Sequence, residues 1–443
     1  MTTINGVTRM LNRLNITAWS ALVVLSLAGC DELLKQTAPS RVNADGLEVP
    51  ANAKLLVDGA RAAFGCALQA YATGAGLMTD EMEDTQLAAA AWDYDRRAWT
   101  TVVGIAYAES PCDASQIFGV YRPVQVARYQ ADYALEVVKG FADADVANKA
   151  LLVQTAALYA GYSYVLLGEG FCTTAVSAPT EILTAGGSAE LTSADVFAVA
   201  EAKFTEAIAG PDANLANAAR LGRARVRLNL AKPEGGAVNT AKLAEARADA
   251  AAIPAGFVYN IPYNAATSYS QNLLYRRQKD FVLYGIAPTY RGLEFDGVPD
   301  PRVAVTNTGI RGADGTSIVW AADKYSSQTS PIALAKYQEA QLIIAEIDGG
   351  QAAVDIINAL HDAVGLPHFT SSDEAAIQAQ VIEERGRELF LEGQHFYDIR
   401  RLNLPLNPAA GTAYPLKGGT YGDQRCWPLP DVERFNNPKL GDG

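Results

Sequence analysis

Histidine is scarce in this 443-residue chain, and the motifs of common catalytic and metal-binding sites are missing. The three histidines, His361, His368 and His395, lack the H-x-x-x-H spacing of a zinc site, and no C-x-x-C pair occurs. A nucleotide-binding P-loop and the G-x-S-x-G motif of serine hydrolases are absent too. The sequence therefore predicts no metal and no cofactor, and we expect His361 and His368 to lie at the surface or at helix caps.

Positive charge is also in short supply. Lys and Arg number 36 against 49 Asp and Glu, which gives a formal charge of −13. This balance argues against a protein that reads the phosphate backbone of nucleic acids or adheres to anionic lipid by charge. Because hydrophobic residues make up 49% of the chain and charged residues 19%, we expect a well-packed globular protein.

Long apolar runs are missing as well, apart from a short one near the N-terminus. Arg9 and Arg13 are the only charges among the first 29 residues, and they precede the apolar segment Ile16–Leu27. That segment is too short for a permanent membrane span, and it ends in Leu-Ala-Gly followed by Cys30. The order resembles a bacterial lipoprotein signal, in which the cysteine thiol receives a lipid before cleavage.

This pattern predicts a signal peptide at residues 1–29, lipidation of Cys30, and a polar tether over residues 30–45. The covalent lipid would be the only attached group. The alternative is an ordinary secretory signal with a coincidental cysteine.

The four remaining cysteines are an even number in an exported chain, which permits two disulfides with three possible connectivities. We predict Cys66–Cys112, closing an N-terminal loop, and Cys172–Cys426, tying a helix end to the C-terminal tail. Free buried thiols are the alternative.

Apolar residues recur at three- and four-residue spacings through much of the chain, which predicts a mainly α-helical fold. Thr192 and Asp195 form a capping signature at one helix start, and small residues such as Ala157, Ala160 and Gly161 would let helices approach closely. Short breaks between helices favour helical hairpins of the tetratricopeptide type, with an ordinary α-helical domain as the alternative. The predicted helices are Tyr121–Val138, Asn148–Leu167, Thr192–Ile208, Ala216–Leu230, Thr240–Ala252, Pro331–Ile347, Ala353–Val364 and Ser371–Gly393, the last with a capping box from Ser371 and Glu374.

Two stretches break the helical pattern. Residues 64–115 and 256–330 are rich in aromatic and turn-forming residues, which indicates long surface excursions with a few short strands. We therefore expect one domain over residues 46–443. Its helical scaffold would occupy about 120–255 and 331–400, its ligand-binding loops the two excursions, and its irregular tail 401–443.

A charged motif near the C-terminus resembles a known family signature. The segment 381–401 follows the pattern E-R-x-x-E-L, then E-G-x-R-aromatic-x-D-L-x-R, of SusD/RagB-like lipoproteins, with His395 where Arg is usual. Residues 336–346, 356–367 and 427–438 resemble further parts of that family. The residues that match the signature are Glu384, Arg385, Glu388, Leu389, Glu392, Gly393, Phe396, Asp398 and Arg401.

The residues of this motif suggest structure rather than catalysis. Glu383 and Arg387 are four apart on one helix face and can pair. The acids and Arg385 could form an ion-pair network that anchors Arg400 and Arg401. Paired carboxylates such as Glu384 and Glu388 also occur in glycosidases, so a catalytic role is the alternative.

The resemblance implies a non-enzymatic nutrient-binding lipoprotein of the cell outer membrane that faces the cell exterior. Such proteins cover a SusC-like TonB-dependent barrel and capture a glycan, or a peptide, for import. The candidate ligand-binding aromatics are Trp92, Tyr94, Trp99, Tyr290, Trp320 and Tyr325, with Trp320 the first choice because Gly, Asp and Ser surround it. A different function would be an envelope scaffold whose helical hairpins bind other proteins.

Overall fold

The computed structural model describes residues 46–86, 89–99, 119–177, 188–415, 418–434 and 437–440, without the side chains of residues 89–92. The predicted signal peptide, Cys30, the tether and Cys112 lie outside the described residues. The chain forms two compact units, residues 1–52 and 53–443. In the described part of the first unit, the Asn52 side chain donates a hydrogen bond to the Gly46 carbonyl at 2.7 Å. Apart from the 3-10 turn Pro50–Asn52, all further description concerns the second unit.

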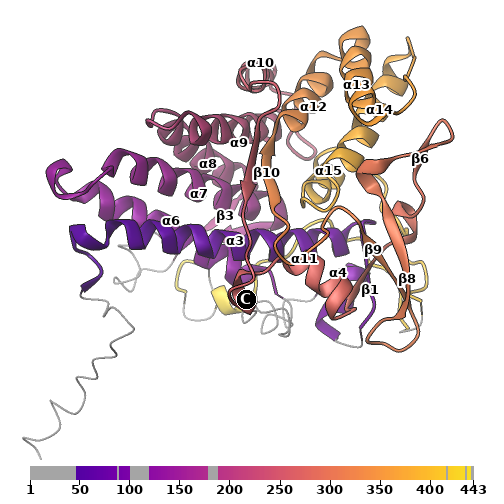
Figure 1. Ribbon diagram of the computed structural model, residues 1–443, viewed down its shortest axis with the longest axis horizontal. Helices are drawn as coiled ribbons and strands as arrows, with labels where there is room; N and C mark the ends of the chain where they lie inside the picture. The colour runs from indigo at the N-terminus through magenta and orange to yellow at the C-terminus, as the bar shows by residue number, and fades with distance from the viewer. Residues whose placement is uncertain are drawn as a thin grey trace, which may run out of the picture. The chain divides into compact units, whose positions relative to one another are not determined.

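Successive antiparallel helices build the first half of this unit, each packed on its neighbour in the sequence (Figure 1). The five helices predicted between residues 121 and 252 are present, with ends that differ by at most three residues. The mainly α, hairpin-based fold class is thus confirmed. The layer consists of α3 Ala53–Met78, α6 Tyr121–Gly140, α7 Lys149–Gly170, α8 Ser193–Ile208, α9 Ala213–Ala231 and α10 Thr240–Ala251.

Polar side chains cap the starts of several of these helices, and one of the caps was predicted. Thr192 and Asp195 form the predicted capping box at α8, and each satisfies a backbone N–H of the other. Asp212 caps α9 through the Leu215 N–H at 2.9 Å, and Asn239 caps α10 through the Lys242 N–H at 3.1 Å. Local sequence therefore sets where these helices begin.

Helix α3 corrects the prediction of a loop-rich excursion at residues 64–115. The helix continues to Met78, and nearly all of its second half is buried. This half contains many Ala and Gly residues and no polar face, because other parts of the protein surround it on all sides. An amphipathic period is therefore missing, and the sequence pattern does not reveal the helix.

Helix α7 is buried in a similar way. It is the one described helix that is long and apolar enough to cross a membrane by length and composition, and 72% of its apolar window is buried inside the protein. Such burial is typical of the core helix of a helical layer.

The second helical group follows a strand. Residues predicted as the first turns of a helix, 332–336, instead form β10 Ile332–Lys336, which pairs antiparallel with β4 Val258–Ile261. The predicted Ser371 cap is also wrong, because Asp373 caps its helix while Glu374 accepts the Gly350 N–H at 2.9 Å. The helices are α12 Tyr337–Asp348, α13 Gly350–Val364, α14 Glu374–Glu388 and α15 His395–Arg401.

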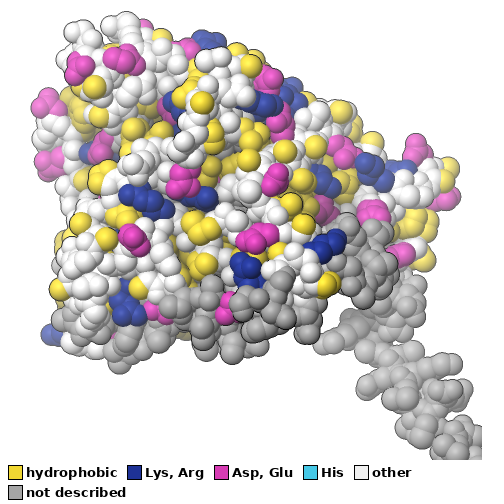
Figure 2. Space-filling view, turned by 180° about the vertical axis from the view of Figure 1, so that it is seen from behind, with side chains coloured by type: hydrophobic (Ala, Val, Ile, Leu, Met, Phe, Trp, Pro, Cys, Tyr) yellow, Lys and Arg dark blue, Asp and Glu magenta, His cyan; other side chains and the backbone are white. Residues whose placement is uncertain are grey.

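Residues 256–330 form turns and short strands, as predicted. Two strand pairs lie within this stretch, and both are antiparallel: β6 Glu294–Phe295 with β7 Val298–Pro299, and β8 Val305–Arg311 with β9 Ile318–Ala322. Two further antiparallel pairs involve strands from earlier in the chain: β1 Met82–Asp84 with β5 Tyr284–Ile286, and β2 Thr173–Ala175 with β3 Glu190–Thr192. Short helical pieces are α4 Ala89–Arg96, α11 Leu273–Tyr275, a π-helical turn Arg276–Asp280, α16 Asp431–Arg434, and 3-10 turns at Pro50–Asn52, Asp143–Asp145, Ser268–Ser270, Pro288–Tyr290 and Pro301–Val303. On the face seen in Figure 2, acidic and basic side chains are interspersed among apolar ones.

Candidate ligand-binding site

The charged motif of the C-terminal signature forms a buried ion-pair network between helices. Arg385 on α14 donates to the Asp398 carboxylate on α15 at 2.9 and 3.1 Å. Arg401 donates to Glu346 on α12 at 2.6 and 2.8 Å and also to Asp398. Burial alone would raise the pKa of Glu346, but the nearby charges of Arg401 and Arg385 outweigh it and hold that pKa well below its usual range. The network locks three helices together.

Glu384 and Glu392 of the signature are also held by basic side chains in buried contacts. Glu384 has no exposed side-chain surface, and its oxygens accept from Arg302 at 2.6 Å and contact the His361 imidazole at 2.8 Å. Glu392 accepts from Lys324 at 2.7 Å and Lys336 at 2.9 Å. Carboxylates held in buried pairs do not present the open acid–base pair that glycoside hydrolysis requires.

Two details of the predicted network need correction. Glu383 and Arg387 pair at 2.8 Å as predicted. Arg400, however, pairs with Glu234 outside the motif. His361 is fully buried against Glu384 rather than at the surface, whereas His368 is exposed and contacts Asp362 at 2.8 Å.

Four of the six predicted ligand-binding aromatics are core residues, so the prediction that they stack on a ligand is wrong. Tyr94 packs edge-on against Trp99 with ring centroids 4.4 Å apart, and Tyr290 stacks on Phe390 at 4.9 Å. Tyr325 is 3% exposed. Burying an aromatic side chain removes a large apolar area from water, and this stabilises the fold. Trp92 lies in α4, and its side chain is outside the described part of the structure.

Trp320 is the predicted aromatic that remains half-buried at the surface. It lies on β9, and the Arg291 guanidinium is 5.2 Å from the centre of its ring. Arg291 also forms an ion pair with Glu83 on β1 and donates to the Ile286 carbonyl at 2.8 Å. The side chains of Arg291 and Glu83 are 21% and 27% exposed. These three residues, Trp320, Arg291 and Glu83, are called the Trp320 platform below.

Irregular backbone positions this platform. The π-helical turn Arg276–Asp280 leads to Val282, whose φ of +50° is strained for a β-branched residue. The Val282 carbonyl accepts from the Thr85 hydroxyl at 2.9 Å, and the Gln278 side chain accepts the Ala322 N–H at 2.8 Å. These contacts tie the ends of β1 and β9 to the segment that precedes β5. Irregular turns of this kind occur frequently at functional sites.

The platform can bind a polar ligand that has an apolar face. The Arg291 guanidinium lies over one face of the Trp320 ring, so the exposed part of the indole offers an apolar surface bordered by charge. The Arg291–Glu83 pair provides both hydrogen-bond donors and acceptors at that border. Among the residues that the structure describes, no group of three or more His, Cys, Asp and Glu side chains is arranged to hold a metal ion. Sequence reasoning missed Arg291 and Glu83, since they are far apart in the chain and neither stands in a motif.

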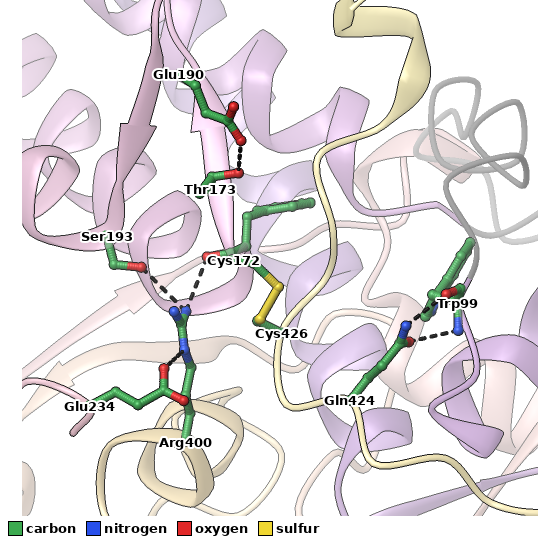
Figure 3. Close-up of a disulfide and its surroundings, with 10 residues drawn as sticks. Trp99, Cys172, Thr173, Glu190, Ser193, Glu234, Arg400, Gln424 and Cys426 are labelled. Carbon is green, nitrogen blue, oxygen red and sulfur yellow. Dashed lines mark hydrogen bonds and ion pairs between the residues drawn. A yellow bond between two sulfur atoms is a disulfide. The ribbon is translucent and has the colours of Figure 1, made fainter. Parts of the chain in front are cut away.

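A disulfide fixes the C-terminal tail to the helical layer. Cys172, two residues after α7, is bonded to Cys426, one of the two predicted pairs (Figure 3). Beside it, Arg400 donates to Glu234 at 2.7 Å and to Ser193 at 3.2 Å. Gln424 makes two hydrogen bonds of 2.7 Å with the Trp99 backbone. Cys66 is also disulfide-bonded, and its predicted partner lies outside the described residues.

Comparison with known proteins agrees with this architecture. The sequence model of the SusD family matches residues 333–439. No curated protein matches the sequence.

Solved structures match over most of the chain. A SusD-like carbohydrate binding protein from Bacteroides vulgatus has a TM-score of 0.63 at 15% identity, covering 88% of this chain and 97% of its own. A SusD-like carbohydrate binding protein from Bacteroides fragilis has a TM-score of 0.61 at 16% identity, covering 88% and 98%. A SusD superfamily protein from Parabacteroides distasonis has a TM-score of 0.61 at 14% identity, covering 90% and 98%. At such identities the likeness shows the fold. Together with the family-model match over residues 333–439, it confirms the resemblance to SusD/RagB-like proteins that the sequence shows.

Proposed function

We propose that this chain is a non-enzymatic surface lipoprotein that captures a nutrient glycan and passes it to a SusC-like TonB-dependent barrel of the outer membrane. Three observations support the proposal: the SusD family match, the SusD-like fold, and the description of two similar structures as carbohydrate binding proteins. The Trp320 platform is the observation in this chain that carries it.

The chemistry of the platform favours a glycan. A sugar ring has an apolar face that can stack on the exposed part of the Trp320 indole, while its hydroxyls can exchange hydrogen bonds with Arg291 and Glu83. Ionised partners make the stronger hydrogen bonds, so the Arg291–Glu83 pair would orient the sugar. The signature acids Glu384 and Glu392 are held in ion pairs with Arg and Lys side chains, which suits a structural role rather than catalysis.

Binding to the full chain in detergent tests this proposal. A panel of neutral oligosaccharides would be titrated by calorimetry against the wild type and the Trp320→Ala variant. We expect about ten-fold weaker binding in the variant, which corresponds to about 1.4 kcal/mol. Ile310→Ala is the matched control, because Ile310 is 52% exposed on the same hairpin and lies outside the platform. Unchanged affinity in Trp320→Ala would remove the platform from the proposal.

The membrane and partner parts of the proposal need a separate test. Lipid attached to Cys30 would hold the protein at the outer membrane with its binding surface toward the exterior. Affinity purification of the native protein from detergent extracts should recover a TonB-dependent barrel. Recovery of envelope assembly proteins in its place would favour the scaffold function.

A further inference from the structure

A groove lies against the first half of α3, and Trp320 is not among the residues that line it. It has a volume of about 580 Å³ and lies between α3 and the loop that follows β4. Its apolar lining includes Ala62, Ala63 and Pro262, and its polar lining includes Arg61 and Tyr269. We call it the Arg61 groove.

The loop that forms one wall of the groove is held in place by its own hydrogen bonds. The Tyr263 hydroxyl donates to the Gly65 carbonyl of α3 at 2.8 Å, which fixes the loop to the helix. The Ser270 hydroxyl donates to the Asn264 side chain at 2.8 Å, and the Asn264 N–H donates to the Ser270 carbonyl at 2.8 Å. A wall ordered before binding loses little conformational entropy when a ligand arrives.

Two side chains in the groove are available to a ligand. Tyr269 is 59% exposed, which is unusual for an aromatic side chain in this protein. Arg61 is exposed and forms no hydrogen bond or ion pair with any described residue. Asp58, the acid in the same lining, is already paired with Lys54. The groove therefore combines an open aromatic ring, an unpaired cation and an acid whose charge is balanced.

We infer that the Arg61 groove is a second saccharide site that takes a carboxylate-bearing sugar, such as a uronic acid residue. The Tyr269 ring would stack on the sugar, and the Arg61 guanidinium would form a charge-assisted, bidentate pair with the carboxylate. This inference rests on the proposed function. It goes beyond that function by naming a second site and an acidic ligand class.

The Arg61 groove and the Trp320 platform are separate sites. Arg61 lies near the start of α3, and Glu83 of the platform follows the end of the same helix at Met78. Seventeen residues of helix at about 1.5 Å per residue put about 25 Å between the backbone of Arg61 and that of Met78. One glycan chain that reaches both sites would gain affinity, since the second contact would be intramolecular.

A peptide fits the groove less well. Peptide ligands are commonly held by free backbone groups of the binding protein. In this loop the backbone N–H groups of Asn264, Ala266, Thr267 and Ser270 all have partners within the loop. These four N–H groups are therefore not free for a peptide, and the available side chains suit a ring and a carboxylate.

The test uses two ligands that share the same sugar chain, one with charged carboxylates and one with the carboxylates esterified. Tri-galacturonic acid and its methyl ester, which is neutral, would be titrated against the full chain in detergent. We expect the acid to bind at least ten-fold tighter than the ester, with the difference shrinking as salt is raised. Arg61→Gln should remove this difference and leave ester binding unchanged, whereas Tyr269→Ala should weaken both ligands.

Controls separate this inference from the proposed function. Arg122→Gln removes another exposed arginine, on α6, and should change nothing. Thermal melting shows that each variant is folded. Equal binding of acid and ester, an unchanged preference in Arg61→Gln, or tighter binding of a tri-glutamate peptide would each overturn the inference. Loss of neutral-glycan binding in Trp320→Ala bears only on the proposed function, because Trp320 is not part of the groove.

Discussion

At the residue scale, the position where this chain departs from the family signature has its own ion pair. His395 replaces the usual Arg and contacts the Asp80 carboxylate at 3.0 Å. Burial alone would lower the pKa of His395, but the hydrogen bond and charge of Asp80, together with Glu81, outweigh it and raise that pKa to about 9. The cation that the family places here is thus kept at neutral pH by a different side chain.

The raised pKa predicts a pH-dependent stability. The ordinary pKa of histidine is about 6.5, so the contribution of the pair is fully present below pH 6.5 and is lost as the pH rises through 9. His395→Gln should lower the free energy of unfolding at pH 6 by about 1–3 kcal/mol and have little effect at pH 10. Urea denaturation at both pH values measures this. His368→Gln is the control, since His368 and Asp362 are 57% and 68% exposed and such pairs contribute little.

At the element scale, close contacts between helices depend on small residues that face aromatic rings. A Cβ atom added to Gly161 on α7 would lie 2.6 Å from the Phe204 ring on α8, and one added to Gly222 on α9 would lie 2.4 Å from the same ring. Real Cβ atoms do not approach so closely, so a side chain or a helix would have to move. Phe204 is therefore packed between two helices that approach it through glycine.

This packing predicts that alanine at two helical glycines will have different effects on stability. Gly161→Ala should reduce the free energy of unfolding by about 1–3 kcal/mol, because an extra methyl group overpacks the core. Gly140→Ala, at the end of α6, meets no atom within 4 Å and should be neutral or stabilising by up to about 1 kcal/mol. Chemical denaturation of both variants compares them directly. No loss of stability in Gly161→Ala would show that the Phe204 ring can move aside, which would contradict the prediction.

At the scale of the whole molecule, the C-terminal tail is part of the core. Trp427 is fully buried, and its ring contacts those of Tyr71, Tyr94, Phe171 and Phe396, which come from distant parts of the sequence. The neighbouring Cys172–Cys426 disulfide closes a loop of 254 residues. The first helices and the last segment of the unit are thereby joined.

Removal of this disulfide should destabilise the whole unit. A loop this long restricts the unfolded chain strongly, so Cys172→Ser with Cys426→Ser should cost about 2–5 kcal/mol. The melting temperature of the wild type should fall on addition of a reductant. The double variant should still respond to the reductant, but less, because Cys66 is in another disulfide. An identical response in both proteins would contradict the structural role of Cys172–Cys426.

The sequence by itself determined the features that depend on neighbouring residues. Helices α6 to α10 were predictable because their apolar spacing and their caps, such as Thr192 with Asp195, are local. The family recognition also came from a contiguous run of residues. The pairing of Cys172 with Cys426 was one choice among three that the sequence allowed.

Tertiary structure alone decided which side chains face solvent. Like Trp320, four other predicted residues are aromatic and lie in similar stretches, yet they are buried: Tyr94, Trp99, Tyr290 and Tyr325. Helix α3 escaped prediction because burial on every side removes the amphipathic pattern. Arg291 meets Trp320 and Glu83 only after β1, β5 and β9 come together. Burial and long-range contacts are properties of the packed molecule, so a local pattern of residues does not encode them.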